Sequence, residues 1–224
     1  MHPAFEPIAR VRNAKPPLPA ALTRTGMTIY VYPNDLVSHW VRFVVAEKDM
    51  DGMHIEWVKP GQTLEDLTVL DPAHRVPLLA EREVILNAPR IIVEYLDERY
   101  PHPPMMPVEP SARAKLRLAL HRIEQDLFPL VSAIQSGPMR EAQKARKQLL
   151  DNILAGTPIF GAKNYFLSSD FSMVDALWAT LLWRLPSLGI PLPAHAKIIQ
   201  RYADRLFGRP AFGQSLTPAE RALR

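Results

Sequence analysis

Between residues 27 and 100 the hydrophobic pattern switches repeatedly between strand-like and helix-like spacing. Short runs rich in β-branched and aromatic residues predict strands at 28–32, 54–58, 76–79 and 84–86. Apolar residues at helical spacing predict a helix from Ser38 onward, a short turn over 64–70 and a helix over 91–99. The early alternation predicts a parallel βαβ unit, and the two later strands follow each other closely enough to form an antiparallel hairpin.

This order of strands and helices is typical of a thioredoxin-like domain, which we place at residues 27–100. Residues 101–110 then contain five prolines, which exclude a helix interior or a central strand and favour a stiff, extended linker. From 111 to 224 the apolar residues recur at helical spacing. The sequence therefore predicts an α/β half followed by an all-helical half.

Three features mark helix boundaries in the second half. Ser172 and Asp175 form the pattern of a capping box, in front of a run that is apolar almost all round and is therefore expected to be a central buried helix. Pro129 is expected to kink the first long helix. Residues 217–220 are expected to open a short last helix.

The first 26 residues contain five prolines and no hydrophobic period, which predicts a disordered arm. Met27 opens the first predicted strand directly, so a start of translation at Met27 instead of Met1 stays open. The arm accounts for +3 of the formal net charge of +4. The remaining charge is too small for a phosphate-binding face, and we expect no direct binding to nucleic acid.

The composition excludes several other classes of site. The chain has no cysteine, which excludes a disulfide, a thiolate metal site and a cysteine nucleophile and suits a reducing compartment. It has neither an apolar run of about 18 residues nor a secretory leader, so we expect a cytoplasmic protein without a membrane partner. It has no Gly-rich phosphate loop and no HExxH motif, so we expect no cofactor and no metal.

The two-part plan resembles that of the glutathione transferases. Val76-Pro77 falls where that superfamily places a cis-proline before its third strand, and Ser172 to Asp175 matches its capping box. Within the superfamily, the chain resembles the stringent starvation protein A family in the order and spacing of SHWVR (38–42), AEK (46–48), RIIVEYLDER (90–99), PHPP (101–104), YFLS (165–168) and LLWRLP (181–186). This resemblance covers residues 27–224 and implies the glutathione-transferase fold.

Members of that family are bacterial regulators that bind RNA polymerase during starvation, and they are not known for transferase activity. The resemblance therefore implies a non-enzymatic transcription regulator of the stress response that binds RNA polymerase holoenzyme. It also implies a homodimer, because this architecture usually pairs, and a heterodimer with a related chain stays open. The alternatives are a glutathione-dependent transferase with a degenerate glutathione site and a plain dimeric scaffold.

The positions at which a transferase would hold glutathione carry unsuitable residues. The resemblance places the γ-glutamyl carboxylate at Ala88-Pro89, where alanine offers no side-chain donor and proline lacks a backbone N–H. Asp35 stands where related chains have a cysteine, and its charge would repel a thiolate. Ser38 or Tyr32 is a candidate thiol activator, although we expect Ser38 to be the N-cap of its helix. The backbone beside Val76-Pro77 could still hold the cysteinyl part of glutathione.

The sharpest candidate for partner binding is Tyr100 with the segment Pro101-His102-Pro103-Pro104. Its prolines fix the backbone before binding, so a partner need not restrain a flexible loop. We expect His102 to project as a polar tip, with Tyr100, Met105 and Met106 as apolar contacts nearby. In the family that the chain resembles, this segment lines a surface pocket implicated in contact with polymerase and its sigma factor. On the residues alone, a plain interdomain linker is the other interpretation.

Overall fold

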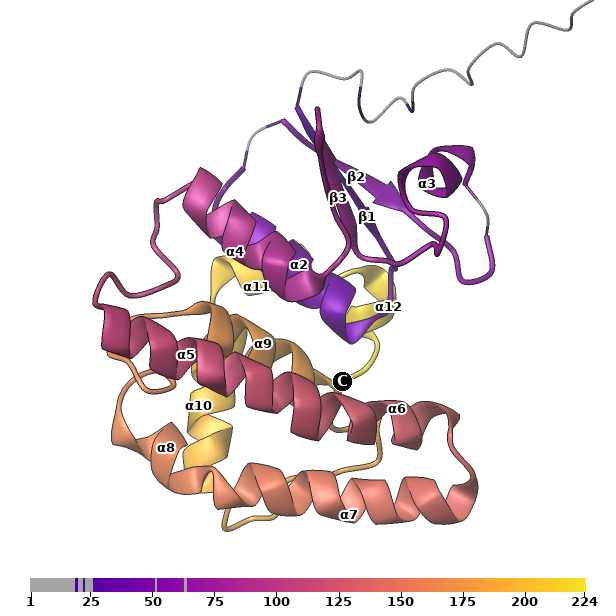
Figure 1. The fold of residues 1–224 in the computed structure, drawn as a ribbon. Helices are drawn as coiled ribbons and strands as arrows, with labels where there is room; N and C mark the ends of the chain where they lie inside the picture. The colour runs from indigo at the N-terminus through magenta and orange to yellow at the C-terminus, as the bar shows by residue number, and fades with distance from the viewer. Residues whose placement is uncertain (1–18, 20–21, 23–25, 51, 63) are drawn as a thin grey trace, which may run out of the picture.

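The computed structural model describes residues 19, 22, 26–50, 52–62 and 64–224. The predicted disordered arm therefore lies almost wholly outside the described residues. Figure 1 shows the described chain as two halves, a small sheet with its helices above and a group of longer helices below. The predicted α/β half followed by an all-helical half is confirmed.

The sheet of the N-terminal half has the strand order β2-β1-β3-β4. β1 (Met27–Val31) pairs in parallel with β2 (Met53–Trp57), and antiparallel with β3 (Leu78–Glu81). β4 (Val84–Leu86) pairs antiparallel with β3 across the turn at residues 82–83. The predicted parallel unit and hairpin are both confirmed, with strand ends displaced by one or two residues.

Three helices accompany this sheet: α2 (Leu36–Glu47), α3 (Glu65–Leu70) and α4 (Pro89–Arg99). The face of α2 that carries Trp40, Val41 and Val44 is completely buried, as its spacing predicted. The Val76-Pro77 peptide bond is cis and directly precedes β3, at the position that the resemblance implied.

The helical half begins one residue earlier than expected. Pro110 is the first residue of α5 (Pro110–Arg122), because a proline at the first helical position gives up no intrahelical hydrogen bond. A π-helical turn over Ile123–Leu127 joins α5 to α6 (Phe128–Ser136), and Pro129 lies in the first turn of α6. The remaining helices are α7 (Met139–Ala155), α8 (Thr157–Ala162), α9 (Met173–Arg184), α10 (Lys197–Phe207), α11 (Pro210–Ser215) and α12 (Pro218–Arg221).

The predicted capping box of the central helix α9 is confirmed. Asp175 Oδ2 accepts hydrogen bonds from the backbone amide and the hydroxyl of Ser172, at 2.9 and 2.6 Å. Its other oxygen accepts from the Phe166 amide and the Tyr202 hydroxyl. Burial raises the pKa of Asp175, and these donors oppose that effect. The same carboxylate therefore starts α9 and ties the preceding loop and α10 to it.

One hydrophobic core runs through both halves of the molecule. α2 lies against α9 and α11, and Trp40 donates from its indole nitrogen to the carbonyl of Met173 at 3.2 Å. In Figure 1 the yellow helices α11 and α12 lie next to the N-terminal half, although they end the chain. The last helices of the chain are therefore held by the N-terminal half.

Candidate functional site

The loop between β1 and α2 holds the residues considered as thiol activators. Asp35 is the N-cap of α2, and its Oδ2 accepts a hydrogen bond from the Ser38 amide at 2.8 Å. The prediction that Ser38 caps this helix is therefore wrong, because Asp35 is an equally good cap and comes first in the chain. Ser38 lies inside the helix and is fully buried, and its hydroxyl oxygen accepts from the Tyr32 amide at 3.1 Å. Tyr32 is only partly buried, so it is the more accessible of the two candidates.

The start of α4 is the position at which a transferase would bind a carboxylate. Ala88 is the N-cap and makes no side-chain hydrogen bond, and Pro89 occupies the first turn. A carboxylate placed here would meet no donor from the Ala88 side chain and no N–H from Pro89. The helix itself starts normally, since proline suits this position.

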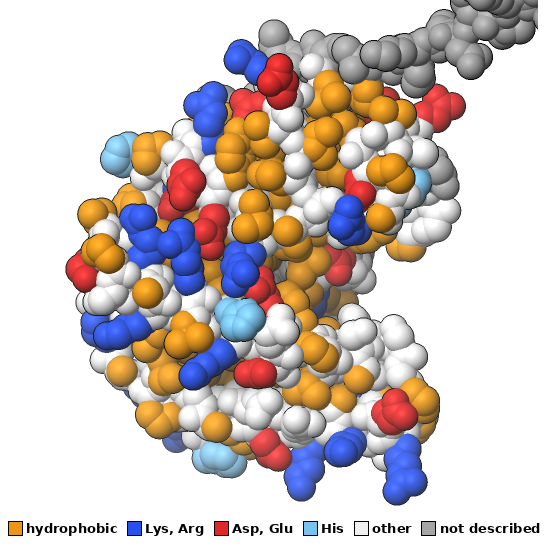
Figure 2. Space-filling view, in the orientation of Figure 1, with side chains coloured by type: hydrophobic (Ala, Val, Ile, Leu, Met, Phe, Trp, Pro, Cys, Tyr) orange, Lys and Arg blue, Asp and Glu red, His pale blue; other side chains and the backbone are white. Residues whose placement is uncertain are grey.

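The last helix is bonded to the β1–α2 loop. The Thr217 hydroxyl donates to the carbonyl oxygen of Pro33 at 2.7 Å, and Arg184 Nη2 donates to the carbonyl oxygen of Asp35 at 3.1 Å. Figure 2 shows the molecular outline hollowed between the two halves, and α12 lies beside this hollow in the same orientation in Figure 1. The helical half therefore fixes the loop that would have to supply a thiol activator.

A buried ion-pair network supports this contact. Glu220 is completely buried and accepts hydrogen bonds from Arg42 at 2.7 Å and from Arg184 at 2.5 Å. Its second oxygen accepts from the backbone amide of Thr217, which caps α12. These partners come from α2, α9 and α12 and lie far apart in the sequence. The predicted short last helix is confirmed, but the sequence did not reveal its role in joining the halves.

His39 completes this network as a neutral side chain. Its Nδ1 must accept a hydrogen bond, because the neighbouring atom at 2.8 Å is a guanidinium nitrogen of Arg184, which can only donate. Its Nε2 therefore donates to the Ser215 hydroxyl at 2.9 Å. Burial lowers the pKa of His39 well below its usual value, and the positive charges of Arg184 and Arg42 act in the same direction.

The proline-rich segment stands out from the surface between α4 and α5. Pro101, His102, Pro103 and Pro104 are all exposed, and Tyr100 is partly buried against the core. We call Tyr100 to Pro104 the ridge. The expectation that Met105 and Met106 add apolar contact beside it is wrong: they are 1% and 9% exposed, because they anchor the segment in the core.

A buried lysine lies under the ridge. Lys48, at the C-terminal end of α2, has a side chain with no exposed surface and donates to Asp97 Oδ1 at 2.5 Å. It also donates to the carbonyl oxygens of Tyr100 at 2.7 Å and Pro103 at 2.6 Å. Asp97 Oδ1 further accepts from the Met105 amide at 2.9 Å. Sequence analysis missed both residues, since a lysine at a helix end is ordinarily exposed.

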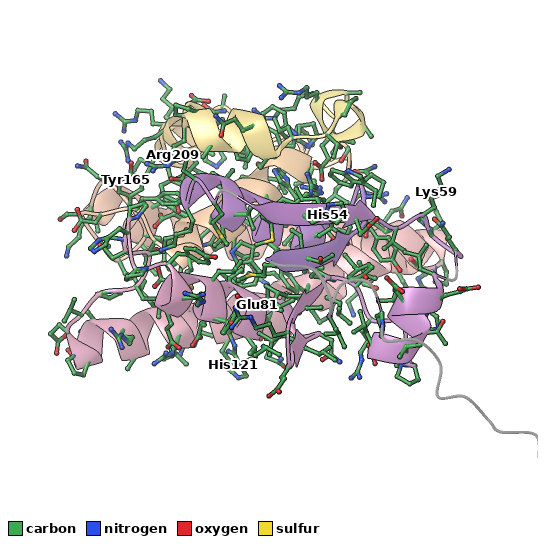
Figure 3. The ribbon with its side chains drawn as sticks, turned by 90° about the horizontal axis from the view of Figure 1, so that it is seen from above. His54, Lys59, Glu81, His121, Tyr165 and Arg209 are labelled. Carbon is green, nitrogen blue, oxygen red and sulfur yellow. The ribbon has the colours of Figure 1, made fainter. Side chains whose placement is uncertain are left out.

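The residue before Lys48 bonds to the opposite half. Glu47 receives two hydrogen bonds from Arg209, at 2.5 and 2.7 Å, and Arg209 also donates to the hydroxyl of Tyr165 at 3.1 Å. Figure 3 shows Tyr165 and Arg209 close together at the end of the molecule where these elements meet. The end of α2 thus fixes both the ridge and the start of α11.

Two other kinds of feature are absent from the described part of the chain. It contains no group of three or more histidine, aspartate or glutamate side chains placed to hold a metal ion. None of its helices is both long enough and apolar enough to cross a membrane.

Comparisons with known proteins place the chain in a family. Residues 118–210 match the family model described as the glutathione S-transferase C-terminal domain. The stringent starvation protein A homolog of Coxiella burnetii (strain RSA 493 / Nine Mile phase I) is 41% identical over 204 residues, which cover 91% of this chain and 97% of that one. The corresponding homolog of Pasteurella multocida (strain Pm70) is 46% identical over 198 residues, covering 88% and 93%.

The fold is similar to that of solved glutathione transferases. The Omega 3C enzyme of Trametes versicolor has a TM-score of 0.77 at 18% identity, with 88% of this chain and 87% of that chain covered. The structural likeness supports the glutathione-transferase fold, and the much higher identity to the bacterial homologs identifies the branch. The chain belongs to the stringent starvation protein A family, within the glutathione S-transferase superfamily.

Proposed function

We propose that this protein is a non-enzymatic transcription regulator that binds RNA polymerase through the ridge at Tyr100 to Pro104. The observation that carries the proposal is an exposed histidine, His102, between prolines whose backbone is anchored from beneath by Lys48. Such a segment loses little conformational freedom on binding. Family membership supports RNA polymerase holoenzyme as the partner.

The same proposal assigns no catalytic residue and no cofactor. A transferase needs donors for the glutathione carboxylate and a group that favours the thiolate. The start of α4 lacks the first at Ala88 and Pro89, and Ser38 is buried inside α2. The alternative, a transferase with a degenerate site, is favoured by one observation: the cis Val76-Pro77 bond is the peptide beside which such enzymes hold glutathione.

The protein is proposed to act in the cytoplasm, where RNA polymerase is found in bacteria. It reaches promoters through the polymerase and makes no direct contact with nucleic acid. The near-neutral charge of residues 27–224 supports this, since direct binding to phosphates requires a surplus of cations on the folded domain.

We further propose that two copies form a homodimer. A cavity of about 600 Å³ lies between α5, the π-helical turn and α7, and its wall includes Leu118, Ile159 and Leu167, which are all exposed. The N-terminal half also exposes apolar side chains, at Ile85 and Ile91. Apolar patches of this kind mark interaction surfaces. If the N-terminal half of each copy packed against the helical half of the other, both apolar patches would be covered.

A pull-down of purified RNA polymerase holoenzyme on the immobilised protein tests this function, with glutathione added in a parallel lane. The proposal predicts that polymerase is retained and that glutathione changes nothing. Loss of retention in both lanes would contradict polymerase binding. Release of polymerase by glutathione would favour a working glutathione site.

A further inference from the structure

The ridge has an unusual hydrogen-bonding chemistry. Pro101, Pro103 and Pro104 have no backbone N–H, so His102 supplies the one amide donor between them. A segment of this kind cannot be held by its own amides, as a strand or a turn is. Its prolines restrict the backbone angles, and donors from elsewhere that reach its carbonyl oxygens can fix its position on the molecule.

Lys48 matches this requirement. Its ammonium group has three N–H donors and no acceptor, and the structure gives it three acceptors: Asp97 Oδ1, the Tyr100 carbonyl and the Pro103 carbonyl. The two carbonyls lie on either side of Pro101 and His102. Fixing both of them to one buried atom therefore sets the path of the peptide between them.

Asp97 holds the far end of the ridge. Its Oδ1 accepts hydrogen bonds from the Lys48 ammonium at 2.5 Å and from the Met105 amide at 2.9 Å. The first amide after the last proline of the ridge is therefore bonded to the same ion pair. Asp97 is 11% exposed, and Lys48 is closed to solvent. Low exposure makes these charge-assisted hydrogen bonds persistent, because water competes poorly for them.

We infer that the buried pair Lys48–Asp97 is a positioning device for partner binding, which holds His102 outward in one orientation. This inference rests on the proposed function, since it concerns the same ridge. Neither residue touches the partner, and both act through the backbone of the ridge. Loss of the pair leaves the ridge composition unchanged and removes its fixed shape, so affinity falls through the added cost of ordering it.

The same geometry specifies the chemistry of the partner surface. Lys48 occupies the carbonyls of Tyr100 and Pro103, while those of Pro101, His102 and Pro104 accept no hydrogen bond from the part of the chain that the structure describes. The ridge thus offers proline rings and backbone acceptors. It fits a groove on the polymerase lined by aromatic side chains and hydrogen-bond donors, as other proline-rich segments do.

Hydrogen exchange measures the positioning without any partner. The variants are Lys48→Met and the double variant Lys48→Met/Asp97→Asn, which leaves no unpaired buried charge and so guards against simple unfolding. The reporter is the Met105 amide, which donates to Asp97. We expect its exchange to accelerate at least tenfold in both folded variants, while amides of β1 and α9 stay protected. An unchanged exchange rate of the Met105 amide would overturn the inference, regardless of the affinity for RNA polymerase.

Binding then links positioning to function. We expect both variants to bind RNA polymerase holoenzyme about tenfold more weakly, a change of about 1.4 kcal/mol. The control is Glu47→Gln, which weakens the neighbouring contact with Arg209 and leaves the ridge anchored. Normal affinity in a variant with a loosened ridge would overturn the inference and leave the proposed function intact. If His102→Ala also binds normally, the ridge itself is not the polymerase site.

Discussion

The hydroxyl of Thr217 donates to the carbonyl oxygen of Pro33 at 2.7 Å, joining the last helix of the chain to the loop after its first strand. In a transferase that loop must face substrate with a free activating group. In this protein the backbone carbonyl of Asp35, in the same loop, accepts a hydrogen bond from Arg184. The side-chain carboxylate of Asp35 caps α2. The loop therefore joins the two halves, which supports the proposal that the protein acts by binding a partner.

Replacement of Glu220 by alanine is expected to destabilise the protein by about 3–5 kcal/mol, because it leaves the buried guanidinium groups of Arg42 and Arg184 without their carboxylate. Urea unfolding followed by circular dichroism measures this change. As a control, Asp151→Ala on the exposed face of α7 should change stability by no more than about 0.5 kcal/mol. Equal effects in the two variants would show that the buried network contributes little.

The pH dependence of stability should show that His39 is neutral in the folded protein. Its pKa is lowered in the folded protein, so below about pH 6.5 the unfolded chain takes up a proton that the folded chain does not. Stability from this source is complete above that pH and is lost as the pH falls. The loss at pH 5.5 relative to pH 8 should be on the order of 1 kcal/mol, and His39→Gln should lack it. A stability difference between wild type and variant that stays constant from pH 8 to 5.5 would contradict a neutral buried histidine.

Glutathione binding should respond to the start of α4. We expect the wild-type protein to bind glutathione with a Kd above about 1 mM, and the variant Ala88→Gln/Pro89→Ser to bind at least about tenfold more tightly. The substitutions restore a hydroxyl, an amide side chain and a backbone N–H at a helix N-terminus. Isothermal titration calorimetry provides the measurement. Micromolar binding by the wild type would instead revive the transferase interpretation.

Much of the fold is readable from the sequence because local signals and burial agree there. The strands, α2 and α4 follow from the hydrophobic period, and the capping box at Ser172 and Asp175 is purely local. The start of α2 was misplaced because Asp35 and Ser38 are both good caps and only the path of the chain selects between them. The short helix α8 and the π-helical turn carried no distinct pattern.

The parts of the site that the sequence did not reveal depend on distant partners. Lys48 meets Asp97 and the ridge 49 to 55 residues later, and Arg42 meets Glu220 178 residues later. A charged side chain gives no local sign that it will be buried, since most such residues are exposed. Met105 and Met106 were misjudged for a related reason, because proline content marks the ridge without showing where it turns inward.

Self-association should depend on the cavity wall at α5. Leu118 is half exposed, and Leu118→Arg places a charge where we propose that a second copy packs. Light scattering after gel filtration should give twice the chain mass of 25.3 kDa for the wild type and a single chain for the variant. Val69→Arg, at an equally exposed apolar residue on α3, is the control and should remain dimeric. A dimeric Leu118→Arg protein would rule out this face as the interface.

The most direct test of the account is the equilibrium affinity of RNA polymerase holoenzyme for His102→Ala compared with His195→Ala. His195 is also exposed and follows a proline-containing loop, so it controls for the loss of a surface histidine beside prolines. We predict at least about tenfold weaker binding for His102→Ala, with an unchanged melting temperature, and normal binding for His195→Ala. Equal affinity of the two variants would contradict the assignment of the ridge as the polymerase-binding site.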